Sequence, residues 1–251
     1  MRQVADVDAE IKWLSQDDED GPVTGFSPSG WEAQTWVLHA MYEDPELHVG
    51  WSHDEFRRKA VEAGEIEPTY VGEVNLDEET TDTGIPLGYV RRPGASWRRL
   101  LWRDHLGWGD EEAPSYPMAP CFRWFPDSSF PASVSAPPEG SLDEESLGAL
   151  LEVLAAHTAD REVRCLYASL ATPSWRRPEL WVGPLSQVPS LLEDNGGRYG
   201  YTPNNLWPED RSWFVWTDSD LQGTRVSGAR QLVDAVKAAA GLETLDWSRP
   251  A

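Results

Sequence analysis

Two aspartates that flank a serine form the motif in this sequence with the clearest capacity for chemistry. Asp218 and Asp220 follow Thr217 and precede Gly223. Carboxylates on one turn are suited to a divalent cation, but calcium needs about six to eight oxygen ligands and no further ligand follows at regular spacing. Asp is also common in turns, because its side chain bonds to the backbone nearby. We therefore expect a turn between two strands, and a carboxylate site remains the alternative.

A second candidate joins an ion pair to aromatic rings. Asp210 and Arg211 lie between Trp207 and Trp213. A guanidinium that stacks on indole rings and pairs with a carboxylate either stabilises a structural corner or binds an anionic group. The sequence favours the structural corner, and Asp210 with Asp218 and Asp220 would carry the chemistry if the protein were an enzyme.

Tryptophan is abundant, with 14 residues in the chain. Most of these side chains are expected in the core. Four tryptophans lie near Arg, Gly or Pro and are candidates for exposed anchors of an interface, where Trp is enriched: Trp102, Trp108, Trp175 and Trp207.

Motifs for catalysis, metal binding and cofactor binding are not evident. The five histidines lack the spacing of a zinc site. No nucleophile elbow and no glycine-rich phosphate loop occurs. Cys121 and Cys165 each lie in an apolar or aromatic stretch, which predicts buried, reduced thiols. We expect no metal, no cofactor and no catalytic residue. The sequence therefore favours a binding protein over an enzyme.

The charge of the chain indicates what kind of partner it has. The formal net charge is −22 over 251 residues, from 43 acidic and 21 basic residues. Phosphate binding needs clustered cations, so nucleic acid and an anionic membrane face are disfavoured. Attraction over long range would instead speed encounter with a basic protein. No apolar run of about 18 residues is found and residues 1–8 resemble no signal peptide, so the expected location is the cytoplasm. The oligomeric state is left open.

The predicted fold class is α+β, with antiparallel-rich sheets and helices packed on one face. We expect an N-terminal α+β region, 1–138, with acidic and proline-rich loops. A C-terminal α+β region, 139–251, follows a Pro-Pro-Glu-Gly linker. Capping boxes at Ser52 and Ser141 predict the starts of two helices, the first ending at Gly64. The second helix is expected to be amphipathic, with Leu147, Leu150, Leu151 and Leu154 at helical spacing. Further helices are expected over 32–42 and 96–106, and strands over 69–76, 86–92 and 121–125.

The C-terminal region contains two similar stretches. In each, two strands precede a glycine and an amphipathic helix. The first stretch has strand 163–170, Gly183 and a helix ending near Gly196, and the second has strand 212–217, Gly228 and a helix ending at Gly241. A duplicated ββα unit and a coincidence both remain open.

Some segments resemble known proteins. Residues 205–221 (NLWPEDRSWFVWTDSDL), 31–42 and 139–143 resemble a family of uncharacterised acidic actinobacterial proteins. Residues 191–197 (LLEDNGG) resemble a stretch of the acidic immunity proteins of bacterial toxin systems, including the Smi1/Knr4-like group. The second resemblance implies an inhibitor that binds a basic toxin domain.

The sequence is therefore compatible with three functions. The first is a non-catalytic, acidic protein-binding module of the immunity type. The second is a structural subunit of a larger assembly, whose acidic face lies in solvent. The third is an enzyme with an unrecognised carboxylate site.

Overall fold

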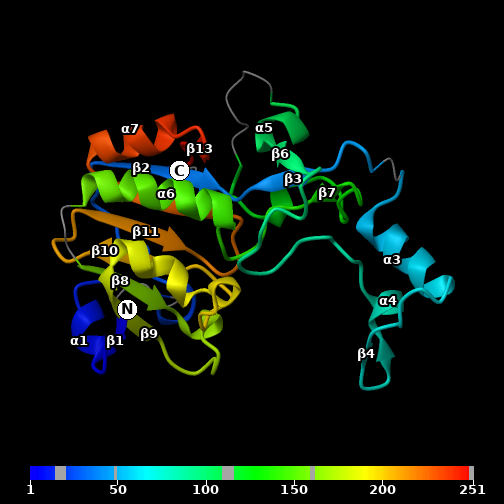
Figure 1. The fold of residues 1–251 in the computed structure, drawn as a ribbon, viewed down its shortest axis with the longest axis horizontal. Coiled ribbons are helices and arrows are strands. Elements are labelled where there is room, and N and C mark those ends of the chain that lie inside the picture. Colours follow the sequence, from blue (N-terminus) through cyan, green and yellow to red (C-terminus); the bar gives the residue numbers. More distant parts are fainter. Residues whose placement is uncertain (15–20, 48–49, 109–115, 159–161, 249–251) are drawn as a thin grey trace.

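An antiparallel sheet of eight strands forms the body of the protein (Figure 1). The computed structural model describes residues 1–14, 21–47, 50–108, 116–158 and 162–248. The strand order is β1-β9-β8-β10-β11-β12-β2-β13. The α+β prediction is confirmed. The strands are β1 (Arg2–Gln3), β9 (Glu179–Pro184), β8 (Glu162–Tyr167), β10 (Asn205–Pro208), β11 (Trp213–Thr217), β12 (Gly223–Gly228), β2 (Ala33–Leu38) and β13 (Glu243–Leu245).

Both faces of this sheet are apolar, and alternate residues of each strand face opposite layers. Helices α6 (Glu144–His157) and α7 (Arg230–Ala238) lie on one face, as predicted, and pack with Cys165 and Val215. The residues next to Cys165 and Val215 in sequence, Leu166 and Phe214, belong to a second cluster on the other face. There the N-terminal segment with α1 (Val7–Ile11) covers an aromatic layer that contains Trp13. Burial on both sides explains why so many strand positions are apolar.

The helix expected over 32–42 is wrong. This segment forms β2 and then β3 (Met41–Glu43). β2 lies between β12 and β13, and it is buried from Thr35 to Leu38. A strand buried on both faces loses its period of two, because polar and apolar residues no longer alternate.

The sheet includes strands from both expected regions. β1 and β2 come from residues 1–138, and the other six strands come from residues 139–251. The boundary at 138/139 therefore does not coincide with a boundary of the sheet. Pro137 and Pro138 accept buried hydrogen bonds from Gln222 and His39, so the proline pair is part of the interior.

The start of α6 differs from the predicted capping box. Asp143, not Ser141, is the N-cap residue, and its Oδ1 accepts a hydrogen bond from the Ser146 amide. Ser141 is buried and bonds to Thr202 instead. Of the four leucines expected on its apolar face, Leu147, Leu150 and Leu154 are buried, and Leu151 is half-buried.

The two similar stretches both form a hairpin followed by a helical segment. β8 and β9 precede η3 (Leu185–Leu191), whereas β11 and β12 precede α7. The first helical segment is a 3₁₀ helix that contains Pro189, which has no amide hydrogen for an α-helical bond. Whether the units arose by duplication stays a prediction.

The central segment departs most from expectation. The helix expected over 96–106 is β6 (Arg98–Leu100) followed by α5 (Trp102–His105), and 86–92 has a single bridge at Leu87 in place of a strand. Residues 121–125 contain the 3₁₀ helix η1 (Phe122–Trp124), not a strand. β6, β3 and β7 (Val134–Ser135) form a small sheet beside the main one. Cys121 and Cys165 are buried free thiols, as expected. The remaining elements of the body are α2 (Gly21–Thr24), η2 (Ser169–Ala171) and η4 (Glu193–Asn195).

Candidate functional site

Residues 50–84 extend away from the body of the protein, and we call them the arm (Figure 1). The arm contains α3 (His53–Glu62), the hairpin of β4 (Tyr70–Val71) and β5 (Val74–Asn75), and α4 (Leu76–Glu79). The strand expected over 69–76 is thus a hairpin that turns at Gly72, where φ is +62°. Because the main sheet and its helices lie elsewhere, the arm is open to solvent on most sides.

The base of the arm is fixed to the segment 129–134. The His53 amide donates to the Phe130 carbonyl at 2.9 Å, and the His53 ring Nε2 donates to the Val134 carbonyl at 2.8 Å. Gly84 lies against the same ring with φ at +74°, and a Cβ there would stand 2.3 Å from His53 Cδ2. Glycine is therefore required where the arm returns to the body.

The predicted helix α3 is confirmed together with its capping box. Ser52 Oγ accepts from the Glu55 amide at 3.2 Å, and Glu55 Oε2 accepts from the Ser52 amide at 3.0 Å. The helix ends before Gly64, which is left-handed, with φ at +71°. Among its residues only Ala60 is buried, so α3 is positioned by polar contacts and not by an apolar core.

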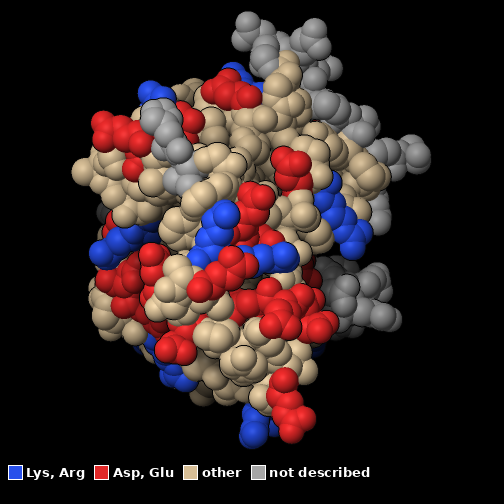
Figure 2. Space-filling view, turned by 90° about the vertical axis from the view of Figure 1, so that its right-hand side faces the viewer, with Lys and Arg blue, Asp and Glu red and all other residues tan. Residues whose placement is uncertain are grey.

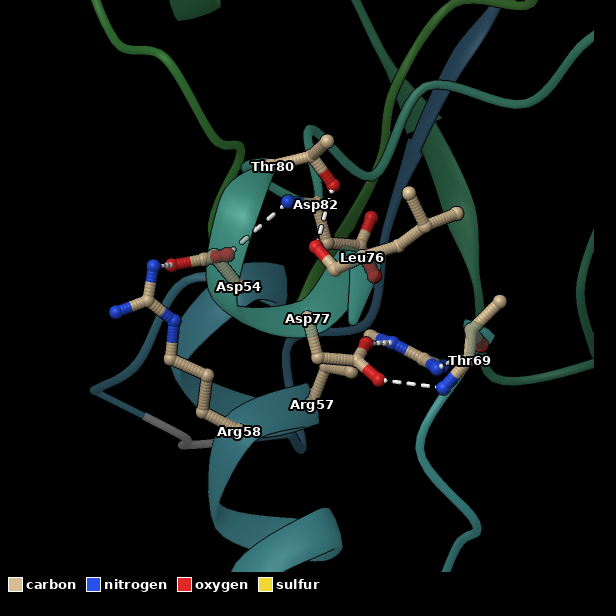
Figure 3. A pocket seen from close by; sticks show the side chains of 8 residues that line it. All are labelled: Asp54, Arg57, Arg58, Thr69, Leu76, Asp77, Thr80 and Asp82. Atoms are coloured by element: carbon tan, nitrogen blue, oxygen red, sulfur yellow. Dashed lines mark hydrogen bonds and ion pairs between the residues drawn. The ribbon is translucent and has the colours of Figure 1, made fainter. Parts of the chain in front are cut away.

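Polar contacts hold α3 against the hairpin around a cavity of about 290 Å³ (Figure 3). The Arg57 Nε donates to Asp77 Oδ1, and the Arg57 Nη2 donates to Thr69 Oγ1 at 2.7 Å. Asp77 Oδ2 accepts from the Thr69 amide at 2.7 Å. The Arg57 guanidinium, followed by the Thr69 amide, lowers the pKa of Asp77 below its ordinary value. This triad joins the helix to the segment that opens the hairpin.

The other acids of this cavity also have partners within the arm. Asp54 pairs with Arg58 at 2.9 Å, and its Oδ1 accepts from the Asp82 amide at 3.0 Å. Asp82 in turn accepts from the Gly84 amide. Among the residues that the structure describes, the lining of the cavity contains neither histidine nor cysteine. The carboxylates around the cavity are occupied by internal hydrogen bonds and ion pairs, which stabilise the arm. We call the lining residues that make these contacts the brace: Asp54, Arg57, Arg58, Thr69, Asp77 and Asp82.

The outer surface of the arm exposes large apolar side chains. At the hairpin, Tyr70 is 58% exposed, Val71 63% and Val74 49%. Phe56 and Ile66 are also exposed, on α3 and on the chain that follows it. Exposed apolar groups gathered on one projection, not scattered singly, are typical of an interaction surface.

Carboxylates surround these apolar groups. The arm has ten acidic residues and three basic ones, and Figure 2 shows Asp and Glu gathered on the face of the molecule that carries the arm. The acidic residues are Asp54, Glu55, Glu62, Glu65, Glu67, Glu73, Asp77, Glu78, Glu79 and Asp82, and the basic ones are Arg57, Arg58 and Lys59. Three of the ten carboxylates are committed to the brace, so most of the acidic charge faces solvent.

The structure places Asp210 and Arg211 in the turn between β10 and β11. Asp210 Oδ1 accepts from the amide and the hydroxyl of Ser212. Arg211 has φ at 55°, and its guanidinium lies 4.5 Å from the Trp13 ring centre. Trp207 is fully buried and makes a T-shaped contact with Trp13, so Arg211 stacks on the Trp13 indole and not between Trp207 and Trp213. The geometry is that of a structural corner.

Asp218 and Asp220 lie in the turn between β11 and β12, as predicted. The Asp220 amide donates to Asp218 Oδ1 at 2.9 Å. This turn is at the opposite end of β11 from Asp210, so the structure does not bring the three aspartates together. Burial, and then the charges of Asp220 and Asp218, raise the pKa of nearby Glu139 above its ordinary value. Among the described residues, no group of His, Cys, Asp and Glu side chains is arranged to hold a metal ion.

Of the four tryptophans suggested as exposed anchors, Trp175 is 71% exposed, whereas Trp102 and Trp207 are buried and Trp108 is half-buried. Trp102 is fully buried, and its Nε1 donates to the His39 carbonyl at 2.9 Å. Trp108 is half-buried and packs against Tyr116 and Trp124. The expectation of exposure is wrong for Trp102, because the small sheet and η1 enclose it with other aromatic rings.

Sequence reasoning did not identify the arm as a surface of interest. The signal available to it was the composition of α3, where seven of the ten residues are charged or histidine and too few apolar residues remain to form a buried face. A capped helix without an apolar face must be stabilised by something other than a core. The apolar residues of the following hairpin then have nothing to pack against.

In comparisons with protein-family models, curated proteins and solved structures, no significant match to this chain was found. Among the described residues, no helix is long and apolar enough to cross a membrane.

Proposed function

We propose that the protein is a non-catalytic, acidic binding module, and that its arm binds a basic protein. The observation that carries this proposal is the exposed apolar surface of Tyr70, Val71 and Val74 on an arm that has ten acidic and three basic residues. Protein interfaces combine an apolar centre with a polar rim, and the arm has both.

The charge distribution favours a basic partner over a neutral one. Acidic groups around the apolar centre would attract a cationic surface over long range and orient it before contact. They would also disfavour acidic competitors by repulsion. Binding of this kind weakens as salt increases, because exposed charges are screened.

The most specific form of the proposal is an immunity-type inhibitor of a basic toxin domain. Two observations support it. The segment 191–197 resembles acidic immunity proteins, and the arm is a narrow projection that can enter a cleft of a partner. The internal hydrogen bonds of the brace hold the arm in one conformation before binding, and such preorganisation lowers the conformational entropy lost on binding.

The experiment is capture of the partner from lysate of the source organism by the tagged protein at low salt, followed by elution at high salt. A variant with Tyr70→Ser, Val71→Ser and Val74→Ser tests the arm. The matched control is Leu87→Ser, because Leu87 is 68% exposed but lies outside residues 50–84.

We expect one basic protein in stoichiometric amount with the wild type and the control, and its loss with the arm variant. Equal capture by all three proteins would refute the assignment to the arm. Self-association that the arm variant abolishes, without a foreign partner, would instead identify a subunit of a larger assembly.

The enzyme alternative depends on a different place in the fold. Glu139 has a raised pKa and faces Asp218 and Asp220, and perturbed carboxyl groups are typical of catalytic acids. Loss of an activity in an Asp218→Asn variant that remains folded would support this alternative.

A further inference from the structure

A second hollow lies where the arm joins the body, and we call it the groove. Its volume is about 560 Å³, and its lining includes Trp51, Glu55, Asp127 and Ser129. Trp51 is 42% exposed, and Asp127 comes from the loop before the segment that fixes the base of the arm. The groove is therefore built by the arm and the body together.

The charges of the groove differ from those of the brace. In the brace, two of the three carboxylates, Asp54 and Asp77, pair with arginines of its own lining. The groove is lined by two carboxylates, Glu55 and Asp127, and by no Lys, Arg or His among the described residues. One oxygen of Glu55 accepts from the Ser52 amide, which holds the carboxylate in place while lone pairs remain for a second donor.

The indole of Trp51 adds a surface that favours cations. Within the protein, Lys59 Nζ already lies 4.7 Å from the centre of this ring. An ammonium at that distance is attracted by the negative face of the indole. A guanidinium would gain more, because its flat surface stacks on an aromatic ring and its paired N–H groups match a carboxylate.

We propose that the groove is the subsite for an arginine side chain of the basic partner. The inference rests on the proposed function, and it adds the residue type that the partner must present. The guanidinium would displace Lys59 from the Trp51 ring and donate to Glu55 and Asp127. The apolar hairpin and the groove would then contact the same partner at two places along the arm.

The probe for this subsite is a 12-residue peptide of alternating Ala and Arg, compared with peptides in which Lys or Glu replaces Arg. Each peptide is titrated into the protein at low salt, and binding is measured by calorimetry and by NMR. The NMR readout is the indole N–H resonance of Trp51, which is assigned by its loss in Trp51→Phe. We expect the Arg peptide to shift this resonance and to bind more tightly than the Lys peptide, and the Glu peptide to leave it unchanged.

Matched variants separate the groove from net charge. Glu55→Gln with Asp127→Asn removes two carboxylates from the groove, and Gln at position 55 still completes the capping box. Glu62→Gln with Glu65→Gln removes the same charge from exposed positions elsewhere on the arm. We expect the first pair to weaken the Arg peptide roughly fivefold, and the second pair by less than about twofold.

Equal losses in the two double variants would overturn the subsite, as would an Arg peptide that leaves the Trp51 resonance unmoved. Either result leaves the proposed function standing if the captured partner is still lost with the hairpin variant. Conversely, the hairpin variant could still capture the partner while the Arg peptide binds the groove. That result would refute the role of the hairpin and leave the subsite standing.

Discussion

His39 is a buried titratable group whose protonation state links stability to pH. The side chain is fully buried between the main sheet and residues 137–138. Its Nδ1 donates to the Pro138 carbonyl at 2.7 Å, and its Nε2 lies 3.0 Å from Thr224 Oγ1. Burial lowers the pKa of His39 to about 4, although the Pro138 carbonyl and Asp143 act in the opposite direction. The folded protein therefore keeps this ring neutral at pH 5.

The sign and size of the effect follow from linkage. In the unfolded chain the histidine has its ordinary pKa of about 6.5, so between pH 6.5 and 4 the unfolded state binds a proton that the folded state does not. Stability is complete above the higher value and is lost as pH falls through this window. The total loss is about 3 kcal/mol, of which about 2 kcal/mol is lost by pH 5.

The assay is urea unfolding of the wild type and of His39→Asn at pH 7.5 and pH 5.0. Asn can keep the donor to Pro138 but does not titrate, so it removes only the pH dependence due to this ring. We expect the wild type to lose about 2 kcal/mol more than the variant between the two pH values. Parallel losses in the two proteins, or an imidazole whose NMR signals titrate near pH 6.5 in the folded state, would refute the reasoning.

Three further predictions concern the arm, a buried carboxylate and the core. Gly84→Ala places a Cβ against the His53 ring and strains a positive φ, so hydrogen exchange should rise within residues 52–84 and stay unchanged in the main sheet. Glu243→Ala leaves the amides of Trp102 and the next residue without their acceptor, which should cost about 1–3 kcal/mol in urea unfolding. Burial raises the pKa of Glu243, so the folded state holds this proton more tightly than the unfolded state does, and the free energy of unfolding falls as pH rises through the folded-state pKa. A Glu243→Gln variant does not titrate, so its free energy of unfolding should rise relative to that of the wild type over the same pH range. Leu154→Ala, in the fully buried face of α6, should lower the free energy of unfolding by about 2–5 kcal/mol, and a loss below 1 kcal/mol would contradict the packing described.

The sequence was sufficient for elements whose signals are local. The start of α3 was predicted from Ser52 and Glu55, because a capping box depends on residues three apart. The buried leucines of α6 were predicted from their spacing. The turn at Asp218 was predicted from the preference of Asp for turns.

Elements that depend on distant partners were not predictable in the same way. β2 is a strand because β12 and β13, about 200 residues later, pair with its two edges. Trp102 was expected at the surface because Arg103 and Gly107 are near it in sequence, yet rings from 124 and 125 enclose it. The arm was missed for the opposite reason, because exposed Tyr70 and Val71 have the residue types of a core strand.

The position of β2 also determines when the protein can fold during synthesis. Residues 36–42 (WVLHAMY) are uncharged and largely apolar, and in the finished sheet both edges of β2 are paired by strands from beyond residue 222. At typical rates of translation this segment would wait on the order of ten seconds or more for its partners. During that interval an apolar strand without neighbours is liable to aggregate. The growing chain is therefore expected to need a chaperone that shields this segment until β12 and β13 have left the ribosome.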